Sequence, residues 1–240
     1  MNHMGGVTTR EKLEREAIVQ CGISPLNLAS EFRHMLDASA IIPGFVAASA
    51  GGGGGAAILT SADASGGVFR LITDGGTSAD AYAQHGGNVI GRFSDTDAPF
   101  YIAGRMKFIT STMGAAVKIA IGLTDNGLGT NDAVLIGACG AGSTTKFGIV
   151  KVAATVPTGH DLGTDLDTAM HEFRIWRPRG GGAIYARLDA GANQSVGTTG
   201  QPTAANEARI TVLAHNGAAT ANVREIHIDW MFWAGERSSL

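Results

Sequence analysis

The stretch Arg224-Glu225-Ile226-His227-Ile228-Asp229-Trp230 alternates polar and apolar side chains with a period of two. Successive side chains of a β-strand point to opposite faces of its sheet. The two isoleucines and Trp230 would therefore share one face, while His227 and Asp229 share the other. The stretch predicts a strand whose apolar face lies in the core of a β-sheet protein.

Similar runs recur along most of the chain and predict about eleven strands. They lie near 56–60, 68–73, 88–93, 100–109, 116–124, 133–138, 146–153, 172–177, 183–189, 209–215 and 224–233. Turn-forming clusters separate them, and the 35 glycines are roughly 15% of the chain, about twice ordinary usage. Because no long helix lies between the runs, a parallel α/β sheet is excluded. We expect an all-β sandwich of two antiparallel sheets.

The beginning of the chain has a different pattern, which predicts a short helical arm. Residues 10–20 are rich in helix formers, and Leu13, Ala17 and Cys21 form a narrow apolar stripe at helical spacing. Gly22 is expected to end this helix.

A second short helix is predicted after it. Ser24-Pro25 has the residue types of an N-cap and a first helical position, and Leu28 and Phe32 recur at helical spacing, as far as 35–36. Neither helix is long enough to be stable alone. We expect both to pack on the sandwich or on a neighbouring subunit.

A run of five glycines at 51–55 predicts a flexible hinge. The predicted organisation is a helical arm over 1–50, a hinge over 51–55 and a β-sandwich domain over 56–240.

Five blocks in the second half of the chain resemble the concanavalin A-like jelly-roll superfamily of lectins, laminin-G-like modules and glucanases. In chain order they are FYIAGRMK (100–107), IAIGLTD (119–125), HEFRI (171–175), AIYARLDAG (183–191) and IHIDWM (226–231). The fourth block departs from the usual Asp-Gly ending, because Ala190 intervenes. The resemblance implies a jelly-roll fold and does not define an activity, since such folds host many functions.

The low charge and the Gly-, Ala- and Thr-rich composition, together with a helical arm, also resemble small virion proteins of tailed bacteriophages. Capsid decoration (cement) proteins and tail proteins of these phages often use jelly rolls. This resemblance implies a structural role in a virion.

The overall charge gives no sign of a nucleic-acid partner. The net charge is −3, the sequence pI is about 6.1, and no basic stripe is present. The nearest candidate is the group Arg174, Trp176, Arg177 and Arg179. We interpret it as strand alternation that runs into a turn.

Residues 1–6 lack the pattern of a signal peptide, and no run of 18 apolar residues is present. We therefore expect no membrane partner and a protein kept in the cytoplasm or carried out within a larger assembly. Cys21 and Cys139 lack metal-ligand spacing and are expected to be buried in a reducing compartment.

The candidate acids do not match the family's catalytic pattern. Sandwich glucanases carry a Glu-x-Asp-x-x-Glu triplet, which this chain lacks. Glu225, His227 and Asp229 could form a proton-handling row on one strand face. We favour a solvated face instead, because the row contains no nucleophile–acid pair at a matched distance. We predict that the protein is not an enzyme.

Two polar loops could be considered as metal sites. The first holds Asp125, Asn126, Asn131 and Asp132, whose oxygens suit Ca²⁺, although Asn and Asp beside Gly are also ordinary turn residues. The second holds His160, Asp161, Asp165 and Asp167 and precedes His171, without metal-ligand spacing. We favour turn chemistry for both, and predict no metal and no cofactor.

The tryptophans could form a sugar-stacking platform. Trp230 is expected in the core with the isoleucines of its strand, whereas Trp176 and Trp233 are expected to be exposed. For these two we favour packing in the core or at an interface over sugar stacking. The predicted partner-binding residues are Leu13, Ala17, Leu28, Phe32, Trp176 and Trp233.

Three functions are compatible with these patterns. The first is a virion protein, made in the host cytoplasm, that decorates a phage capsid as a homo-oligomer bound to the major capsid protein or other virion subunits. The second is a carbohydrate- or receptor-binding module of a phage tail, with a glycan as partner. The third, which we favour least, is a hydrolase with an unrecognised site.

Overall fold

The protein is described by a computed structural model covering residues 10–34, 45–50, 57–61, 68–73, 80–85, 92–95, 97–109, 113–125, 130–203, 205–216 and 223–236. Helix α1 spans Arg10–Cys21. The strands are β1 (Leu28–His34), β2 (Phe45–Ala50), β3 (Ala57–Ser61), β4 (Val68–Ile72), β5 (Asp80–His85), β6 (Phe100–Ile109), β7 (Lys118–Thr124), β8 (Ala133–Cys139), β9 (Lys146–Ala153), β10 (Val156–Asp165), β11 (His171–Arg177), β12 (Tyr185–Leu188), β13 (Gln194–Ser195), β14 (Arg209–His215) and β15 (Glu225–Glu236).

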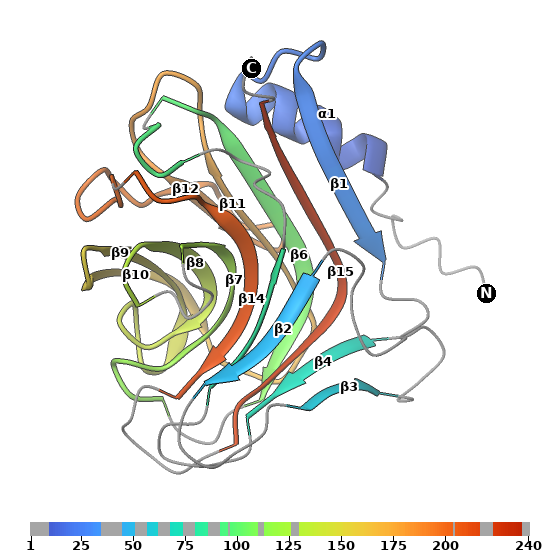
Figure 1. Cartoon of the computed structure of the whole chain (residues 1–240), viewed down its shortest axis with the longest axis vertical. Coiled ribbons are helices and arrows are strands. Elements are labelled where there is room, and N and C mark those ends of the chain that lie inside the picture. Colours follow the sequence, from blue (N-terminus) through green and yellow to red (C-terminus); the bar gives the residue numbers. More distant parts are fainter. Residues whose placement is uncertain are drawn as a thin grey trace.

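The described strands form two antiparallel sheets that pack face to face (Figure 1). Sheet A has the order β13-β12-β11-β6-β15-β4-β3, and β1 also pairs with β15. Sheet B has the order β10-β9-β8-β7-β14-β5-β2. The expected two-sheet antiparallel sandwich is therefore confirmed, with α1 as an additional layer outside sheet A.

The inner core lies between the sheets and is made of alternate side chains of each strand. From β6 it receives Phe100, Ile102, Met106 and Phe108, which are all buried. The ring of Phe108 packs edge to face with that of Phe173 on β11, with centroids 5.3 Å apart. Such aromatic pairs add to the stabilisation that apolar burial provides.

Strand β15 changes the side to which its residues point, because its pairing with β6 shifts register between Ile228 and Trp230. A bulge of one residue reverses the alternation. Ile228, Met231 and Trp233 consequently lie in the inner core, whereas Trp230 and Phe232 lie on the outward face of sheet A. The prediction that Trp230 shares a face with the isoleucines is wrong for this reason.

The predicted strands are confirmed most closely where the apolar pattern is strongest. Strands β6, β9 and β14 have the predicted bounds. Near 88–93, the described residues contain an isolated bridge between Arg92 and Glu207 in place of a strand. Five strands lie outside the predicted runs: β1, β2, β5, β10 and β13.

The second predicted helix is wrong, because Leu28–His34 is strand β1, paired antiparallel with β15. Leu28 and Phe32 are four residues apart, and that spacing puts them on one face of a strand as well as of a helix. Pairing with the edge of β15 gives the backbone N–H and C=O groups of this segment their hydrogen-bond partners. This outweighs the local preference of the segment for a helix. The glycines at 51–55 lie outside the described residues.

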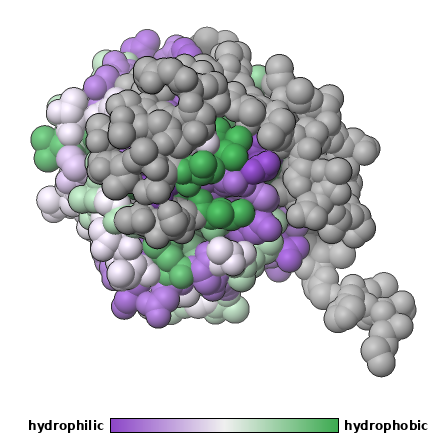
Figure 2. All heavy atoms as spheres, turned by 90° about the horizontal axis from the view of Figure 1, so that it is seen from below, coloured by the Kyte–Doolittle hydropathy of each residue, from purple (hydrophilic) through white to green (hydrophobic). Residues whose placement is uncertain are grey.

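The end of the molecule away from α1 has a mixed surface. Seen from below, hydrophobic residues gather near the middle of this face, and hydrophilic residues surround them (Figure 2). Within the described part, the helical segment is not long and apolar enough to cross a membrane.

The bulge in β15 turns Trp233 into the inner core, so truncating this side chain should destabilise the fold. We expect Trp233→Ala to lower the free energy of unfolding, measured by urea denaturation, by about 3–5 kcal/mol, because the substitution leaves a cavity in the inner core. Val156→Ala on β10, where the side chain is 64% exposed, is the matched control and should change it by less than about 0.5 kcal/mol. If Trp233→Ala lowered the free energy of unfolding as little as Val156→Ala does, Trp233 would lie on the surface and this register would be wrong.

Candidate functional site

Helix α1 lies on the outward face of sheet A, against β6, β11 and β15 (Figure 1). The contact is a second apolar cluster, which we call the α1 cluster. Its buried members are Leu13, Ala17, Cys21 and Ile23 from the N-terminal segment and Tyr101, Ala103, Trp176, Trp230, Phe232 and Ala234 from the sheet. The rings of Trp176 and Tyr185 stack at 5.8 Å beside it, with an angle of 17° between their planes. The predicted packing of this helix on the sandwich is thus confirmed.

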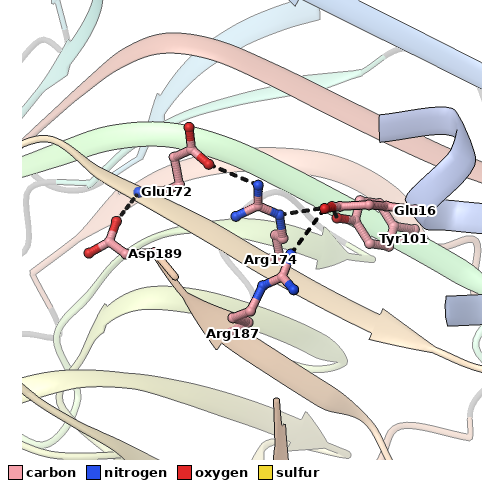
Figure 3. A network of polar contacts seen from close by, with 6 residues as sticks. All are labelled: Glu16, Tyr101, Glu172, Arg174, Arg187 and Asp189. Carbon is pink, nitrogen blue, oxygen red and sulfur yellow. Dashed lines mark hydrogen bonds and ion pairs between the residues drawn. The ribbon is translucent and has the colours of Figure 1, made fainter. Parts of the chain in front are cut away.

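A carboxylate from α1 is held in the same contact by three residues of the sheet (Figure 3). Glu16 Oε2 accepts a hydrogen bond from Tyr101 Oη at 2.5 Å and another from Arg174 Nε at 3.0 Å. Arg187 Nη2 donates to Glu16 Oε1 at 3.2 Å. We call these four residues the Glu16 network. Arg174 also donates to Glu172 Oε2 at 2.8 Å, so its buried guanidinium lies between two carboxylates.

The network stabilises the ionised form of Glu16. Burial by itself raises the pKa of Glu16, but the hydrogen bond from Tyr101 and the charges of Arg174 and Arg187 outweigh it, so the pKa is lowered overall. A carboxylate with a lowered pKa stabilises the fold above its unfolded-state pKa, and this contribution is lost as the pH falls through the folded-state pKa. The attachment of α1 is therefore weakened by acid.

The exit of the chain from α1 is also fixed. Gly22 has a φ of 66°, which a C-terminal helix cap requires, and its N–H donates to Ile18 O. Arg179 N donates to Cys21 O at 2.8 Å, and Cys21 Sγ donates to Phe100 O at 3.2 Å. The two ends of the contact, Glu16 and Cys21, thus hold α1 in one position on the sheet.

Most of the predicted partner-binding residues are used within the chain itself. Leu13 and Ala17 are fully buried in the α1 cluster, and Leu28 is partly buried against it. For Phe32 the structure describes the backbone, which pairs with Phe232. That these residues bind another protein stays a prediction.

The expected exposure of two tryptophans is wrong. Trp176 does lie on the Arg174 side of its strand, but α1 covers that side and leaves the residue 3% exposed. Trp233 is 0% exposed, because the bulge in β15 turns it into the inner core. Neither side chain offers a flat surface to a sugar.

In the predicted row of Glu225, His227 and Asp229, each of the two acids is bound by its own arginine. Arg70 binds Glu225 in a bidentate ion pair, at 2.7 and 2.8 Å, and His227 Nε2 lies 2.9 Å from Glu225 Oε2. Asp229 lies at the bulge and pairs with Arg105 at 2.9 Å. The hydrogen bond from Arg70 is the main cause that lowers the pKa of Glu225, which makes it a poor proton donor near neutral pH.

The first polar loop brings Asp125 and Asp132 together. Asn206 Nδ2 lies 3.4 Å from Asp125 Oδ2 and 3.3 Å from Asp132 Oδ2, and Asp132 Oδ1 accepts a hydrogen bond from Ala154 N. Asn126 lies outside the described residues, and the carbonyl oxygen of Asn131 accepts a hydrogen bond from Thr155 N at 3.0 Å. These hydrogen bonds connect three separate segments of the chain.

Of the second loop, Asp167 contacts His171, which follows the loop. The ring nitrogens of His171 lie 2.7 Å from Asp189 Oδ2 and 2.9 Å from Asp167 Oδ1. His160 lies on β10, opposite Ile149 of β9. Among the residues that the structure describes, no group of three or more His, Cys, Asp or Glu side chains has an arrangement that could hold a metal ion.

Solved structures with the same arrangement of sheets identify the architecture. No protein-family model matches this chain, and no curated protein matches it either. Peanut lectin superimposes with a TM-score of 0.55 at 9% identity, over 89% of this chain and 99% of the lectin. The fold is the concanavalin A-like jelly roll.

Two further jelly rolls extend the comparison. A protein of unknown function from Shewanella oneidensis MR-1 matches 98% of this chain and 99% of its own, with a TM-score of 0.55 and 15% identity. A carbohydrate esterase from the Shiga toxin-encoding bacteriophage phi24B matches 81% of this chain and 91% of its own, with a TM-score of 0.50 and 16% identity. At these identities the likeness concerns the jelly roll alone.

The Glu16 network predicts how α1 is released. We expect Glu16→Gln to lower the free energy of unfolding by about 2 kcal/mol, because it removes hydrogen bonds to a charged group and leaves Arg174 buried with less compensation. Hydrogen exchange of residues 10–21 should accelerate together with this loss. Glu11→Gln is the control on the exposed side of α1 and should change neither quantity. Unchanged exchange in Glu16→Gln would show that α1 is held by its apolar stripe alone.

Proposed function

We propose that the chain is a structural protein of a virion, a capsid decoration protein of a tailed bacteriophage, and that it is not an enzyme. On this proposal it is made in the host cytoplasm, becomes part of the virion, and binds the major capsid protein or neighbouring copies of itself. The observation that carries the proposal is the attachment of α1 to sheet A, together with a side of the helix that is exposed in the part of the chain that the structure describes.

The uncovered side of α1 has the composition of a contact surface. Val19 is 76% exposed, and Leu26, in the turn that follows the helix, is 94% exposed. A hollow of about 390 Å³ runs along the helix. It is lined by Glu11, Lys12, Arg15, Glu16, Val19 and Gln20. Val19 on the fixed helix and Leu26 in the turn after it, beside the charged and polar side chains of the hollow, are favourable for binding another protein surface, because little conformational freedom is lost on association.

The carboxylates of the described residues also support a role without catalysis. Glu16, Glu225 and Asp229 are each paired with arginine. A glycosidase of this fold needs one carboxylic acid that stays protonated near neutral pH beside a second, ionised carboxylate. The arginine partners lower the pKa of Glu16 and of Glu225, so these two carboxylates stay ionised near neutral pH. The phage esterase and the lectins of the same fold do not decide the matter, because the fold hosts both kinds of protein.

Weak contacts suffice for such a role. Many copies on a symmetric shell bind with high total strength even when each contact is weak. The helical contact and the low net charge of −3 are compatible with dense packing of copies around a capsid.

The test uses phage particles that lack this gene, to which purified protein is added back. We expect saturable binding to the capsids, visible as added density by electron microscopy, and greater resistance of the particles to heat. Val19→Glu together with Leu26→Glu should weaken this binding at least tenfold. Val156→Glu, at an exposed site on β10, is the matched control and should bind like the wild type. Particles that bind no added protein would refute the proposal.

A carbohydrate- or receptor-binding module of a phage tail is the second candidate, and the likeness to lectins is the observation that favours it. The burial of Trp176, Trp230 and Trp233 argues against it, because sugars stack on exposed aromatic faces.

A glycan array distinguishes the two candidates. The decoration protein should retain no glycan above background, for lack of an exposed tryptophan. Saturable binding of one glycan class, competed by the free sugar, together with no binding to capsids, would replace the first proposal by the second.

A further inference from the structure

His171 begins strand β11, and both of its ring nitrogens face a carboxylate. Nδ1 lies 2.7 Å from Asp189 Oδ2, and Nε2 lies 2.9 Å from Asp167 Oδ1. A carboxylate oxygen accepts hydrogen bonds, and a neutral imidazole has one N–H to donate. Both hydrogen bonds can therefore exist together only when the ring is the doubly protonated imidazolium.

The ring of His171 lies where the two sheets meet. Its centroid is 4.9 Å from that of Phe147 on β9 of sheet B, and 6.1 Å from that of Phe173 on its own strand. Asp167 belongs to the connection 166–170, which crosses from β10 in sheet B to β11 in sheet A. Asp189 belongs to the turn after β12. His171 thus brings three separate segments of the chain together.

The two carboxylates are not held equally. Asp189 Oδ1 also accepts a hydrogen bond from Glu172 N at 2.8 Å, and Asp189 N donates to Glu172 O at 2.7 Å. Asp167 Oδ1 accepts another hydrogen bond from Ala169 N, which lies in the same connection. The neutral ring keeps one N–H, and the shorter bond to Asp189 favours Nδ1 as its place. Loss of the Nε2 proton then leaves Asp189 attached to the ring and to β11, whereas Asp167 loses its bond to His171. Leu166, at the start of the connection, stays anchored because its N–H donates to Thr145 O at 2.9 Å.

The neighbouring charges point away from the ring. Glu172 follows His171 and therefore faces the outward side of sheet A, where it binds Arg174. Arg105 and Lys107 flank Met106, the partner of His171 on β6, and face that outward side too. Lys146 precedes Phe147 on β9 and points to the opposite face from it. Among the described residues, Asp189 and Asp167 are the charges that act on the ring.

These charges set the direction of the titration. Burial lowers the pKa of His171, but the hydrogen bonds and charges of Asp189 and Asp167 outweigh it and raise the pKa overall. A raised pKa means that the stabilisation is complete below the unfolded-state value, near 6.5, and is lost as the pH rises through the folded-state value. In turn, the hydrogen bond from His171 lowers the pKa of Asp167.

We propose that His171 is a pH-sensitive clasp: the imidazolium holds residues 167–170 against the rim of the sandwich, and loss of its Nε2 proton releases them while the turn at Asp189 stays in place. The two states differ in the attachment of these four residues and leave the sheets intact.

Hydrogen exchange across a pH series tests the clasp in the full-length protein. After correction for intrinsic rates, the amides of 167–170 should exchange slowly below the unfolded-state pKa of about 6.5. They should exchange faster as the pH rises from there to the folded-state pKa of His171, by roughly tenfold for each pH unit, and should show no further increase above it. The titration itself is followed by the NMR signals of the His171 ring. In wild type, protection that does not change across this titration would overturn the proposal.

Three variants make the outcome specific. His171→Gln and Asp167→Asn should both exchange rapidly at 167–170 at every pH, while the amide of Glu172, which Asp189 holds, keeps its protection in Asp167→Asn. His160→Gln removes a histidine that has no carboxylate partner within the described residues, and should behave like the wild type. A pH dependence that persists in both His171→Gln and Asp167→Asn would assign the effect to another group.

Discussion

Sheet A carries apolar side chains on both of its faces, and the rest of the molecule is arranged to cover them. The inner face packs on sheet B, as in any two-sheet sandwich. The outward face presents Tyr101, Trp176 and Phe232, and α1 covers it. Full burial of a large apolar side chain stabilises a fold by about 1.5–3 kcal/mol, so exposing this face would be costly. A helix of twelve residues is marginal alone, and the sheet therefore stabilises α1 as much as α1 covers the sheet.

The apolar pattern of the sequence was sufficient to predict the inner layer of the fold. Strands such as β6 and β9 have long buried runs, and their bounds were predicted correctly. Strand β10 was missed because it is a polar edge strand with a proline, two glycines and a register shift. The face of Trp233 was missed because a bulge leaves no mark in a pattern of alternation. The pairing of β1 with β15 depends on residues about 200 positions apart, which local propensity does not register.

The residues that attach α1 could be predicted only in part. The apolar stripe of Leu13, Ala17 and Cys21 was visible from its spacing, but its partner in the fold was not. Glu16 meets Arg174 and Arg187, which are 158 and 171 residues away, and nothing in the sequence connects them. The same limit applies to function. This chain shares the jelly-roll fold with lectins and with an esterase, and the fold hosts proteins of different function. A functional proposal therefore has to be based on the surfaces of this chain. The surface used here is the exposed side of α1.

The covering of sheet A on both sides can be measured through its tryptophans. Trp176 and Trp230 lie under α1, Trp233 lies in the inner core, and the chain contains no other tryptophan. Iodide is a charged quencher of tryptophan fluorescence that does not enter a packed interior. In the folded protein the account predicts little quenching of a blue-shifted emission, and full quenching once urea has unfolded the chain. A substantial fraction of the fluorescence open to iodide in the folded protein would show that one face of sheet A is uncovered and would contradict the account.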